Sequence, residues 1–161
     1  MIKFDELDEL RPKKGYMDGN NVSLDSIQAR LTAEANNIAV PVAFYHDQVK
    51  SGGLLNKTVE ECLVMHHPDH KSDYYLFTFR VQRQGNIAFV CSDITGVSKQ
   101  VGKQAHAEFA KQDRKGKELS YKIGSLIGQG IRTIGLNKQK LEDEQNFYAA
   151  MHHIIDQVLA D

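Results

Sequence analysis

The residue types best suited to metal chemistry gather in one short stretch of the chain. His66, His67 and His70 lie within five residues, with Asp69 and Asp73 beside them. Imidazole and carboxylate groups are metal ligands, and a tight turn can gather them around one ion. If the preceding residues form a strand, His66 and His67 point to opposite faces. This leaves four candidate metal ligands, which are His67, Asp69, His70 and Asp73. The alternative is a solvated polar turn between two strands.

The clearest asymmetry of the chain is electrostatic. Positions 99 to 140 hold ten basic and three acidic residues, a net charge of +7, whereas the rest of the chain carries −8. A chain polarised in this way can steer anionic partners. The candidate binding residues are Lys99, Lys103, Lys111, Arg114, Lys115, Lys117, Lys122 and Arg132. The alternative is a solvated helix face that acidic residues elsewhere in the chain neutralise.

Small residues recur within the same basic stretch. Ser120, Gly124 and Gly128 step by four, as residues on one helix face do. Such a face lets another backbone approach closely, so we expect close packing within the fold or across a homodimer. The alternatives are a lipid-surface segment and a switchable segment. A phosphate-binding loop is excluded, because Leu136 and Asn137 stand where that motif needs lysine and a hydroxyl residue.

The aromatic content of the basic stretch bears on the choice of partner. Phe109 and Tyr121 are the only aromatic residues from 99 to 140, and Phe109 already belongs to an apolar row. Single-stranded nucleic acid is bound by aromatic side chains interleaved with basic ones. We therefore favour a homo-oligomer or another protein as the partner over nucleic acid or an anionic membrane surface.

Length and composition indicate one soluble domain. The chain has 161 residues, of which 41% are hydrophobic and 25% charged, and domains usually contain about 100–200 residues. No run reaches the roughly 18 apolar residues that span a bilayer. The two cysteines, Cys62 and Cys91, lie inside apolar runs and form no Cys-x-x-Cys pair, so we expect buried thiols. These features favour the reducing cytoplasm.

Periodicity places a β-meander in the middle of the chain. The predicted strands are 38–46, 59–66, 74–83 and 87–92. Pro41 cannot donate to a ladder, so the first of them is expected to lie at an edge or to be broken there. Gly85-Asn86 is a two-residue hairpin signal between the last two. In the third strand Phe77 and Phe79 alternate with Thr78, Arg80 and Gln82, which lie on the opposite, polar face. The aromatic face is expected to face the core; the alternative is a ligand-binding sheet face.

Helices are predicted on both sides of the meander. Ser23 is a candidate N-cap for a helix over 23–36. Its apolar face is expected to consist of Leu24, Ile27, Leu31 and Ala35, which follow at three- and four-residue steps. Apolar residues at four-residue steps predict further helices over 96–115, 117–136 and 138–160.

The order helix, strands, helices predicts an α+β fold. We expect an antiparallel β-meander of about four strands, with one preceding helix and two or three C-terminal helices packed on one face. Residues 1–22 are expected to form an arm and residues 23–161 a single domain.

The expected function is that of a non-catalytic, self-associating interaction protein. It would bind an anionic or protein partner through the basic, glycine-containing segment 99–140. The alternative is a small metal-dependent enzyme or metal-binding protein centred on the turn 66–73. The sequence identifies no cofactor.

Overall fold

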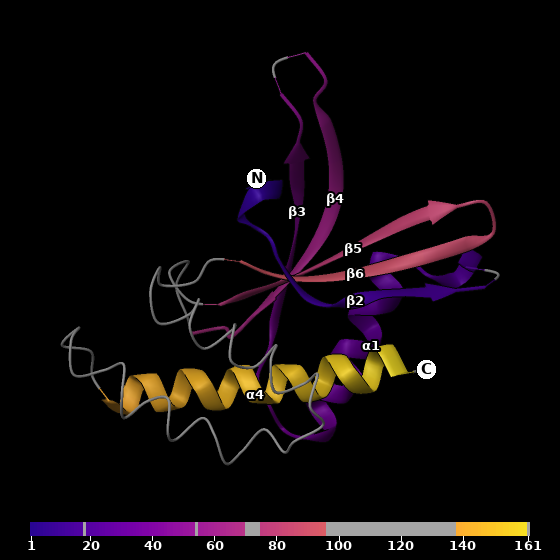
Figure 1. Ribbon diagram of the computed structural model, residues 1–161. Coiled ribbons are helices and arrows are strands. Elements are labelled where there is room, and N and C mark those ends of the chain that lie inside the picture. Colours follow the sequence, from indigo (N-terminus) through magenta and orange to yellow (C-terminus); the bar gives the residue numbers. More distant parts are fainter. Residues whose placement is uncertain (18, 54, 70–74, 96–137, 161) are drawn as a thin grey trace.

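The computed structural model of the chain describes most of its length (Figure 1). The described residues are 1–17, 19–53, 55–69, 75–95 and 138–160. They form six strands, which are β1 (Ile2–Lys3), β2 (Asp8–Tyr16), β3 (Ala43–Ser51), β4 (Thr58–His66), β5 (Leu76–Gln84) and β6 (Ile87–Thr95). The helical elements in this part of the chain are the 3₁₀ turns η1 (Phe4–Glu6) and η2 (Gly19–Asn21) and the α-helices α1 (Leu24–Asn37) and α4 (Lys138–Ala160).

All six strands belong to one sheet in the order β1-β3-β4-β5-β6-β2. β1 runs parallel to β3, whereas the other neighbours are antiparallel. The expected four-stranded antiparallel meander with three or four helices is therefore wrong. The meander forms only the middle of a mixed sheet, and the described residues hold two α-helices. The helices predicted over 96–115 and 117–136 lie outside the described residues.

The two strands missing from the prediction come from the N-terminal part of the chain. β2 has a single buried residue, Leu10, among charged residues and Pro12. Its pairing with β6 shifts register on both sides of Arg11, which breaks the alternation that identifies a strand. Because β2 lies at the edge of the sheet, it tolerates Pro12 and needs few buried side chains.

The first helix begins where its predicted cap lies. The Ser23 hydroxyl accepts a hydrogen bond from the Ser26 amide at 3.1 Å, and the Ser26 hydroxyl accepts one from the Ser23 amide at 2.9 Å. This reciprocal pair satisfies two amides that the helix leaves open. Ile27, Leu31 and Ala35 follow at four-residue steps and are all buried, which confirms the predicted apolar face.

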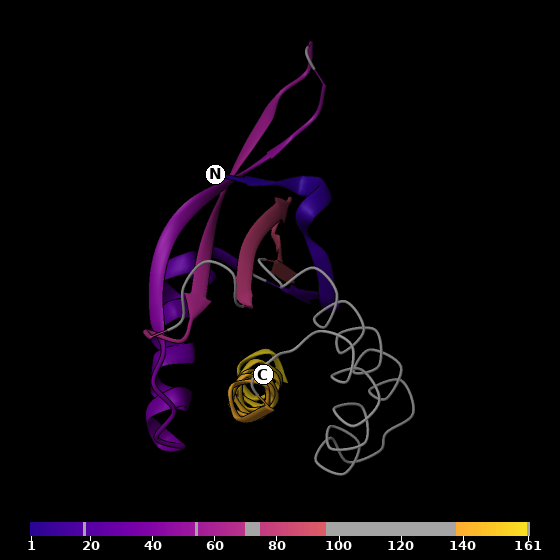
Figure 2. The same ribbon diagram turned by 90° about the vertical axis from the view of Figure 1, so that its left-hand side faces the viewer.

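α1 and α4 lie against each other on one face of the sheet (Figure 2). Phe77 and Phe79 of β5 are fully buried there, as predicted for the aromatic strand. They share a core with the apolar side of α4, whose buried members are Phe147, Tyr148, Met151, Ile154, Ile155 and Val158. The helix predicted over 138–160 is confirmed by α4.

The N-terminal residues cross the other face of the sheet. β1 pairs with β3 near one edge, whereas β2 pairs with β6 at the opposite edge, so the chain between them runs from one side to the other (Figure 2). Ile2 belongs to a second apolar cluster, whose other buried members are Val49, Cys62 and Val64. Leu7 packs against the same cluster. We call residues 2–7 the N-terminal strap.

The two hairpins of the meander diverge. β4 and β5 pair only from Leu63 to Met65 of β4, whereas β3 and β4 pair along their whole length. Past Leu63, the hairpin keeps only β1 as a neighbouring strand, at Val49 and Lys50 of β3. The end of the hairpin projects as a two-stranded ribbon (Figures 1 and 2). Its end is the most extended feature of the described residues.

Candidate functional site

The β3–β4 hairpin ends in a loop that holds an apolar side chain in solvent. Gly52 has a φ of +94°, in the left-handed region that favours glycine, and a side chain there would collide with the backbone across the loop. The hydroxyls of Ser51 and Thr58 form a hydrogen bond of 2.5 Å below it. We call residues 51–58 the hairpin tip. Its Leu55 is 95% exposed, so this leucine serves no internal packing.

Positive charge surrounds the hairpin tip. Lys50 and Lys57 flank the loop, and no aspartate or glutamate occurs from 48 to 59. The next carboxylate on β4 is Glu60, which binds the Arg80 guanidinium at 3.0 Å. The end of the hairpin is therefore both apolar and cationic.

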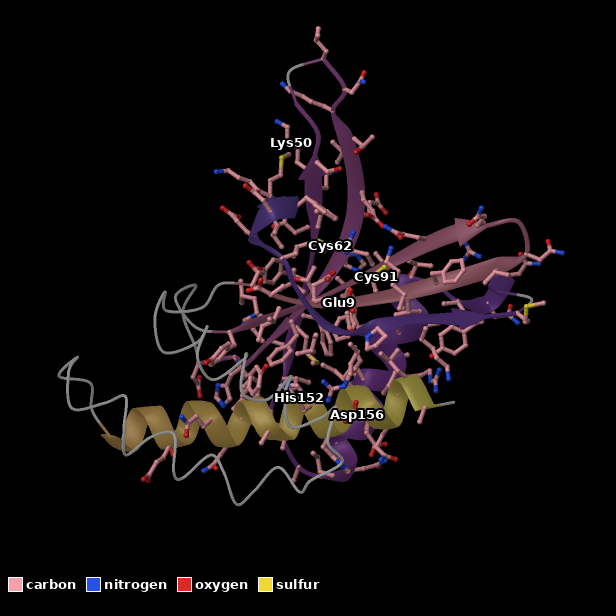
Figure 3. All side chains as sticks on the ribbon, viewed as in Figure 1. Glu9, Lys50, Cys62, Cys91, His152 and Asp156 are labelled. Carbon is pink, nitrogen blue, oxygen red and sulfur yellow. The ribbon has the colours of Figure 1, made fainter. Side chains whose placement is uncertain are left out.

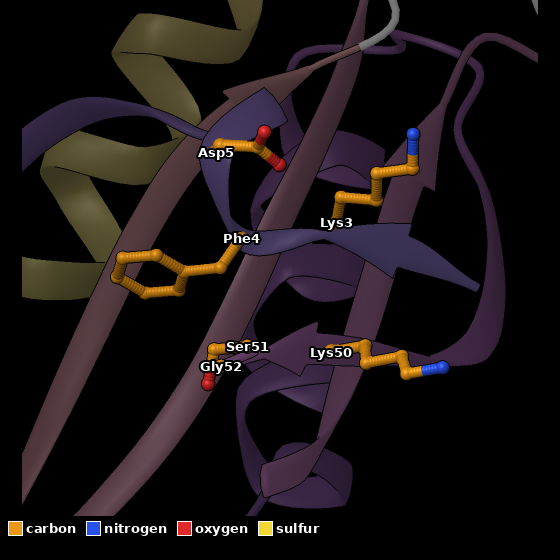
Figure 4. A pocket seen from close by; sticks show the side chains of 6 residues that line it. All are labelled: Lys3, Phe4, Asp5, Lys50, Ser51 and Gly52. Carbon is orange, nitrogen blue, oxygen red and sulfur yellow. The ribbon is translucent and has the colours of Figure 1, made fainter. Parts of the chain in front are cut away.

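A pocket of about 440 Å³ lies where the strap meets the end of β3, beside the hairpin tip. Its lining residues are Lys3, Phe4, Asp5, Lys50, Ser51 and Gly52 (Figure 4). Figure 4 shows the Lys3 and Lys50 side chains extending to the same side, with the Phe4 ring on the other. The pocket thus combines two ammonium groups and the Asp5 carboxylate with one aromatic wall.

Lys3 and Lys50 are direct neighbours in the register of β1 and β3. Like charges opposite each other on paired strands destabilise the pair. Lys3 lies 3.8 Å from the Glu6 carboxylate, and both of these side chains are mostly exposed, so this ion pair offsets little of the repulsion. An anion between the two lysines would relieve it.

A buried ionic network holds the strap behind this pocket. Arg80 is 3% exposed. Its guanidinium donates two hydrogen bonds to Asp93, at 3.0 and 2.8 Å, and one to Glu60 at 3.0 Å. The Phe4 ring centre lies 5.3 Å from the guanidinium carbon, within cation–π range. The network therefore fixes Phe4 and, through it, the neighbouring Lys3.

The ionisation of this network suits a structural role. Burial raises the pKa of Asp93 above its ordinary value, and the hydrogen bonds from Arg80 act against that rise. Burial acts to lower the pKa of Arg80, but its bonds with Asp93 and Glu60 raise it overall. Arg80 remains charged at any physiological pH, so the network is a fixed clamp.

Both cysteines are free thiols buried in the sheet, as predicted. Cys62 lies on β4 and Cys91 on β6, and β5 separates the two strands. Burial raises the pKa of Cys91, and it raises the pKa of Cys62 to about 11. A thiol that stays protonated near neutral pH is a poor nucleophile and a poor metal ligand.

The stability of the protein is expected to fall as the pH rises from about 9 to about 11. The unfolded Cys62 thiol ionises near 9.0, whereas the folded thiol keeps its proton to about 11, so ionisation stabilises the unfolded state relative to the folded state across this window. The slope is roughly 1.4 kcal/mol per pH unit. Urea denaturation of the wild type and of Cys62→Ala at several pH values measures it. Equal pH dependence in the two proteins would contradict the assignment.

The structure places two of the four predicted metal ligands. The Nδ1 atom of His67 accepts a hydrogen bond from the Asp69 amide at 3.1 Å, and the ring stands edge-on to Phe147 at 5.0 Å. His70 and Asp73 lie outside the described residues. Among the residues that are described, no three histidine, cysteine or acidic side chains are grouped to hold a metal ion.

The predicted basic and small residues cannot be placed in this site. Lys99, Lys103, Lys111, Arg114, Lys115, Lys117, Lys122 and Arg132 all lie outside the described residues, as do Ser120, Gly124 and Gly128. In the sequence, the stretch that carries them follows the end of β6 at Thr95 and precedes the start of α4 at Lys138.

A polar contact that the sequence did not reveal joins β2 to α4. The Arg11 guanidinium donates to the Asp156 carboxylate at 2.7 and 3.1 Å and contacts Nδ1 of His152 at 2.6 Å. Figure 3 shows His152 and Asp156 close together on α4. Because a guanidinium only donates, Nδ1 of His152 is the acceptor. This contact holds the edge strand against the helix and lies away from the hairpin tip.

A second pocket, of about 500 Å³, lies along β3 and β4 and is lined by His46, Asp47, Gln48 and Glu61. Asp47 binds the Met1 ammonium at 3.0 Å and accepts a hydrogen bond from the Gln48 amide at 2.8 Å. Its carboxylate is therefore used to anchor the strap. The cationic pocket of Lys3 and Lys50 is the better candidate for a ligand.

Comparison with known proteins adds no assignment to this geometry. No protein-family model, curated protein or solved structure matches the chain. Across the part of the chain that the structure describes, no helix is long and apolar enough to cross a membrane.

Proposed function

We propose that this protein is a non-catalytic interaction protein that binds an anionic partner through segment 99–140. The observation that carries the proposal is the charge of that segment. It holds ten basic and three acidic residues, whereas the rest of the chain has a net charge of −8. Fields of this kind concentrate anionic partners and accelerate their association. The neighbouring Lys3 and Lys50 support the proposal, because they add positive charge on the folded body to that of segment 99–140.

We also propose that the protein self-associates. β2 is the last strand of the sheet, and the outer side of such a strand offers backbone groups to a second chain. The small residues of the basic segment fit close approach between two copies. Light scattering of the full chain is expected to give a multiple of the 18.2 kDa chain mass. A single 18.2 kDa species at all concentrations would remove self-association from the proposal.

Salt-dependent binding of a labelled polyphosphate tests the anionic partner. The full chain is expected to bind it, with an affinity that falls steeply between roughly 50 and 200 mM salt. The variant Lys115→Glu/Lys117→Glu should lose affinity by at least about tenfold, and the slope of log affinity against log salt should shrink by roughly two.

A variant of equal net charge serves as the control. Lys14→Glu/Arg30→Glu changes two exposed basic residues of the folded body and should bind polyphosphate nearly as the wild type does. An equal loss in both variants would show that overall charge, and not segment 99–140, governs binding. No binding by the wild type would end the proposal.

A further inference from the structure

We infer that the hairpin tip is an interfacial anchor for an anionic lipid bilayer. In this arrangement Leu55 enters the boundary between headgroups and acyl chains, while Lys50 and Lys57 contact lipid phosphates. The inference rests on the proposed function, because it names the anionic partner as a membrane surface.

The position of the hairpin tip suits contact with a flat surface. β5 pairs with β4 only at Leu63–Met65, and β1 pairs with β3 only at Val49 and Lys50. The hairpin tip lies past both of these neighbours and projects from the rest of the described residues (Figures 1 and 2). The tip can therefore reach a planar surface before the body does.

The shape of the loop presents its leucine to that surface. Leu55 is 95% exposed, and the positive φ of Gly52 fixes the turn that carries it. Leu54 precedes Leu55 in the sequence, so two consecutive leucines stand where a hairpin loop ordinarily carries polar residues.

The charges around the leucine match anionic headgroups. Lys50 and Lys57 are the charged residues from 48 to 59, and lysine stems can lie along apolar surface while the ammonium group stays at phosphate level. Lys3 and Lys50 also line the pocket beside the hairpin tip, together with Asp5. Basic residues near anionic lipid strengthen surface binding.

A bilayer fits the hairpin tip better than a macromolecular partner does. A stable protein interface buries roughly 800 Å² on each partner, which a single projecting loop cannot supply. Nucleic acid binds on aromatic platforms, and no aromatic residue occurs from 48 to 59. A lipid surface needs only an apolar point and surrounding positive charge.

One shallow anchor gives weak binding, and stable attachment needs a second signal. The basic segment 99–140 supplies that signal in the proposed function. The two contributions are separable, because the leucines act only on lipid, whereas the basic segment acts on any polyanion.

The insertion of the hairpin tip can be observed directly, because the chain contains no tryptophan. In the full-length Leu55→Trp variant, the emission of the single tryptophan should shift to shorter wavelength with vesicles of phosphatidylcholine and phosphatidylglycerol, and brominated acyl chains should quench it. Met17→Trp is the matched control, since Met17 is 78% exposed after the far end of β2 and its tryptophan should stay unquenched.

A variant without both leucines measures how much they contribute to vesicle binding. Leu54→Ser/Leu55→Ser should reduce co-sedimentation with the anionic vesicles by at least about tenfold and leave polyphosphate binding unchanged. A co-sedimentation that this double variant does not reduce would overturn the anchor.

The fluorescence of Leu55→Trp separates the anchor from the proposed function. An unquenched tryptophan in this variant, with intact polyphosphate binding, would overturn the anchor and leave the proposed function standing. A quenched tryptophan without polyphosphate binding would support the anchor and overturn the proposed function. A blue shift that appears without lipid as protein concentration rises would assign the tip to a second copy and overturn the anchor.

Discussion

Replacing Arg80 by methionine is expected to lower the free energy of unfolding by about 3–5 kcal/mol. The substitution leaves Asp93 buried without its two hydrogen bonds and removes the contact between Glu60 and Arg80. A buried carboxylate without a partner is far more costly than the loss of one exposed ion pair. Urea denaturation at neutral pH measures the change, and Lys14→Met, at an exposed position of β2, should differ from the wild type by less than about 0.5 kcal/mol.

The pH dependence of this variant gives an independent test. Burial raises the pKa of Asp93, and the variant lacks the Arg80 hydrogen bonds that oppose that rise. The folded carboxyl then holds a proton at pH values where the unfolded one does not, so the folded state gains stability as the pH falls through the folded pKa. The deficit of Arg80→Met should therefore shrink on acidification from pH 7 toward the unfolded pKa of 3.8. A deficit that is small at pH 7 or that grows on acidification would contradict the clamp.

Replacing Tyr148 by alanine is expected to cost about 3–5 kcal/mol of stability. Tyr148 is 1% exposed and is the point where α4 meets the sheet. Its ring lies 4.8 Å from that of Tyr75, 5.7 Å from that of Phe77 and 4.4 Å from that of His152. Truncation leaves a cavity among these rings, which cannot close the gap without leaving their own contacts.

An exposed neighbour on the same helix controls for helix propensity. Asn146→Ala should leave stability within about 0.5 kcal/mol of the wild type or raise it, because alanine favours helix. Urea unfolding of both variants, followed by circular dichroism, measures the difference. If Tyr148→Ala lost no more stability than Asn146→Ala, α4 would not cover this face of the sheet.

The elements with a regular apolar period could be predicted from the sequence. Ile27, Leu31 and Ala35 identified α1, and the alternation of Phe77 and Phe79 with polar residues identified β5 and the face it buries. Burial on one side imposes these periods, so they are visible without any knowledge of the partner element.

Elements held mainly by distant contacts could not be predicted in this way. The sequence of β2 resembles a charged turn, because Leu10 is the one buried residue along the strand and the register of its pairing with β6 shifts twice. The first predicted strand of the meander, 38–46, is displaced to Ala43–Ser51 in β3, since pairing with β4 rather than hydrophobicity sets its end. Arg80 was assigned to a polar face, and its burial depends on the N-terminal strap, which is distant in the sequence.

The candidate site likewise combines residues that only distant pairing brings together with residues that are visible as a local sequence pattern. Lys3 and Lys50 are far apart in sequence, and only the parallel pairing of β1 with β3 makes them neighbours. The sequence did carry a signal, because two consecutive leucines, Leu54 and Leu55, stand among glycine, asparagine and lysine, the residue types of a turn.

Co-sedimentation of the full-length protein with lipid vesicles at increasing salt tests the central claim most directly. The protein is expected to bind vesicles that contain phosphatidylglycerol, to ignore vesicles of phosphatidylcholine alone, and to dissociate as salt screens the charges. Equal binding to both kinds of vesicle, or no binding to either at low salt, would contradict an anionic membrane surface as the partner.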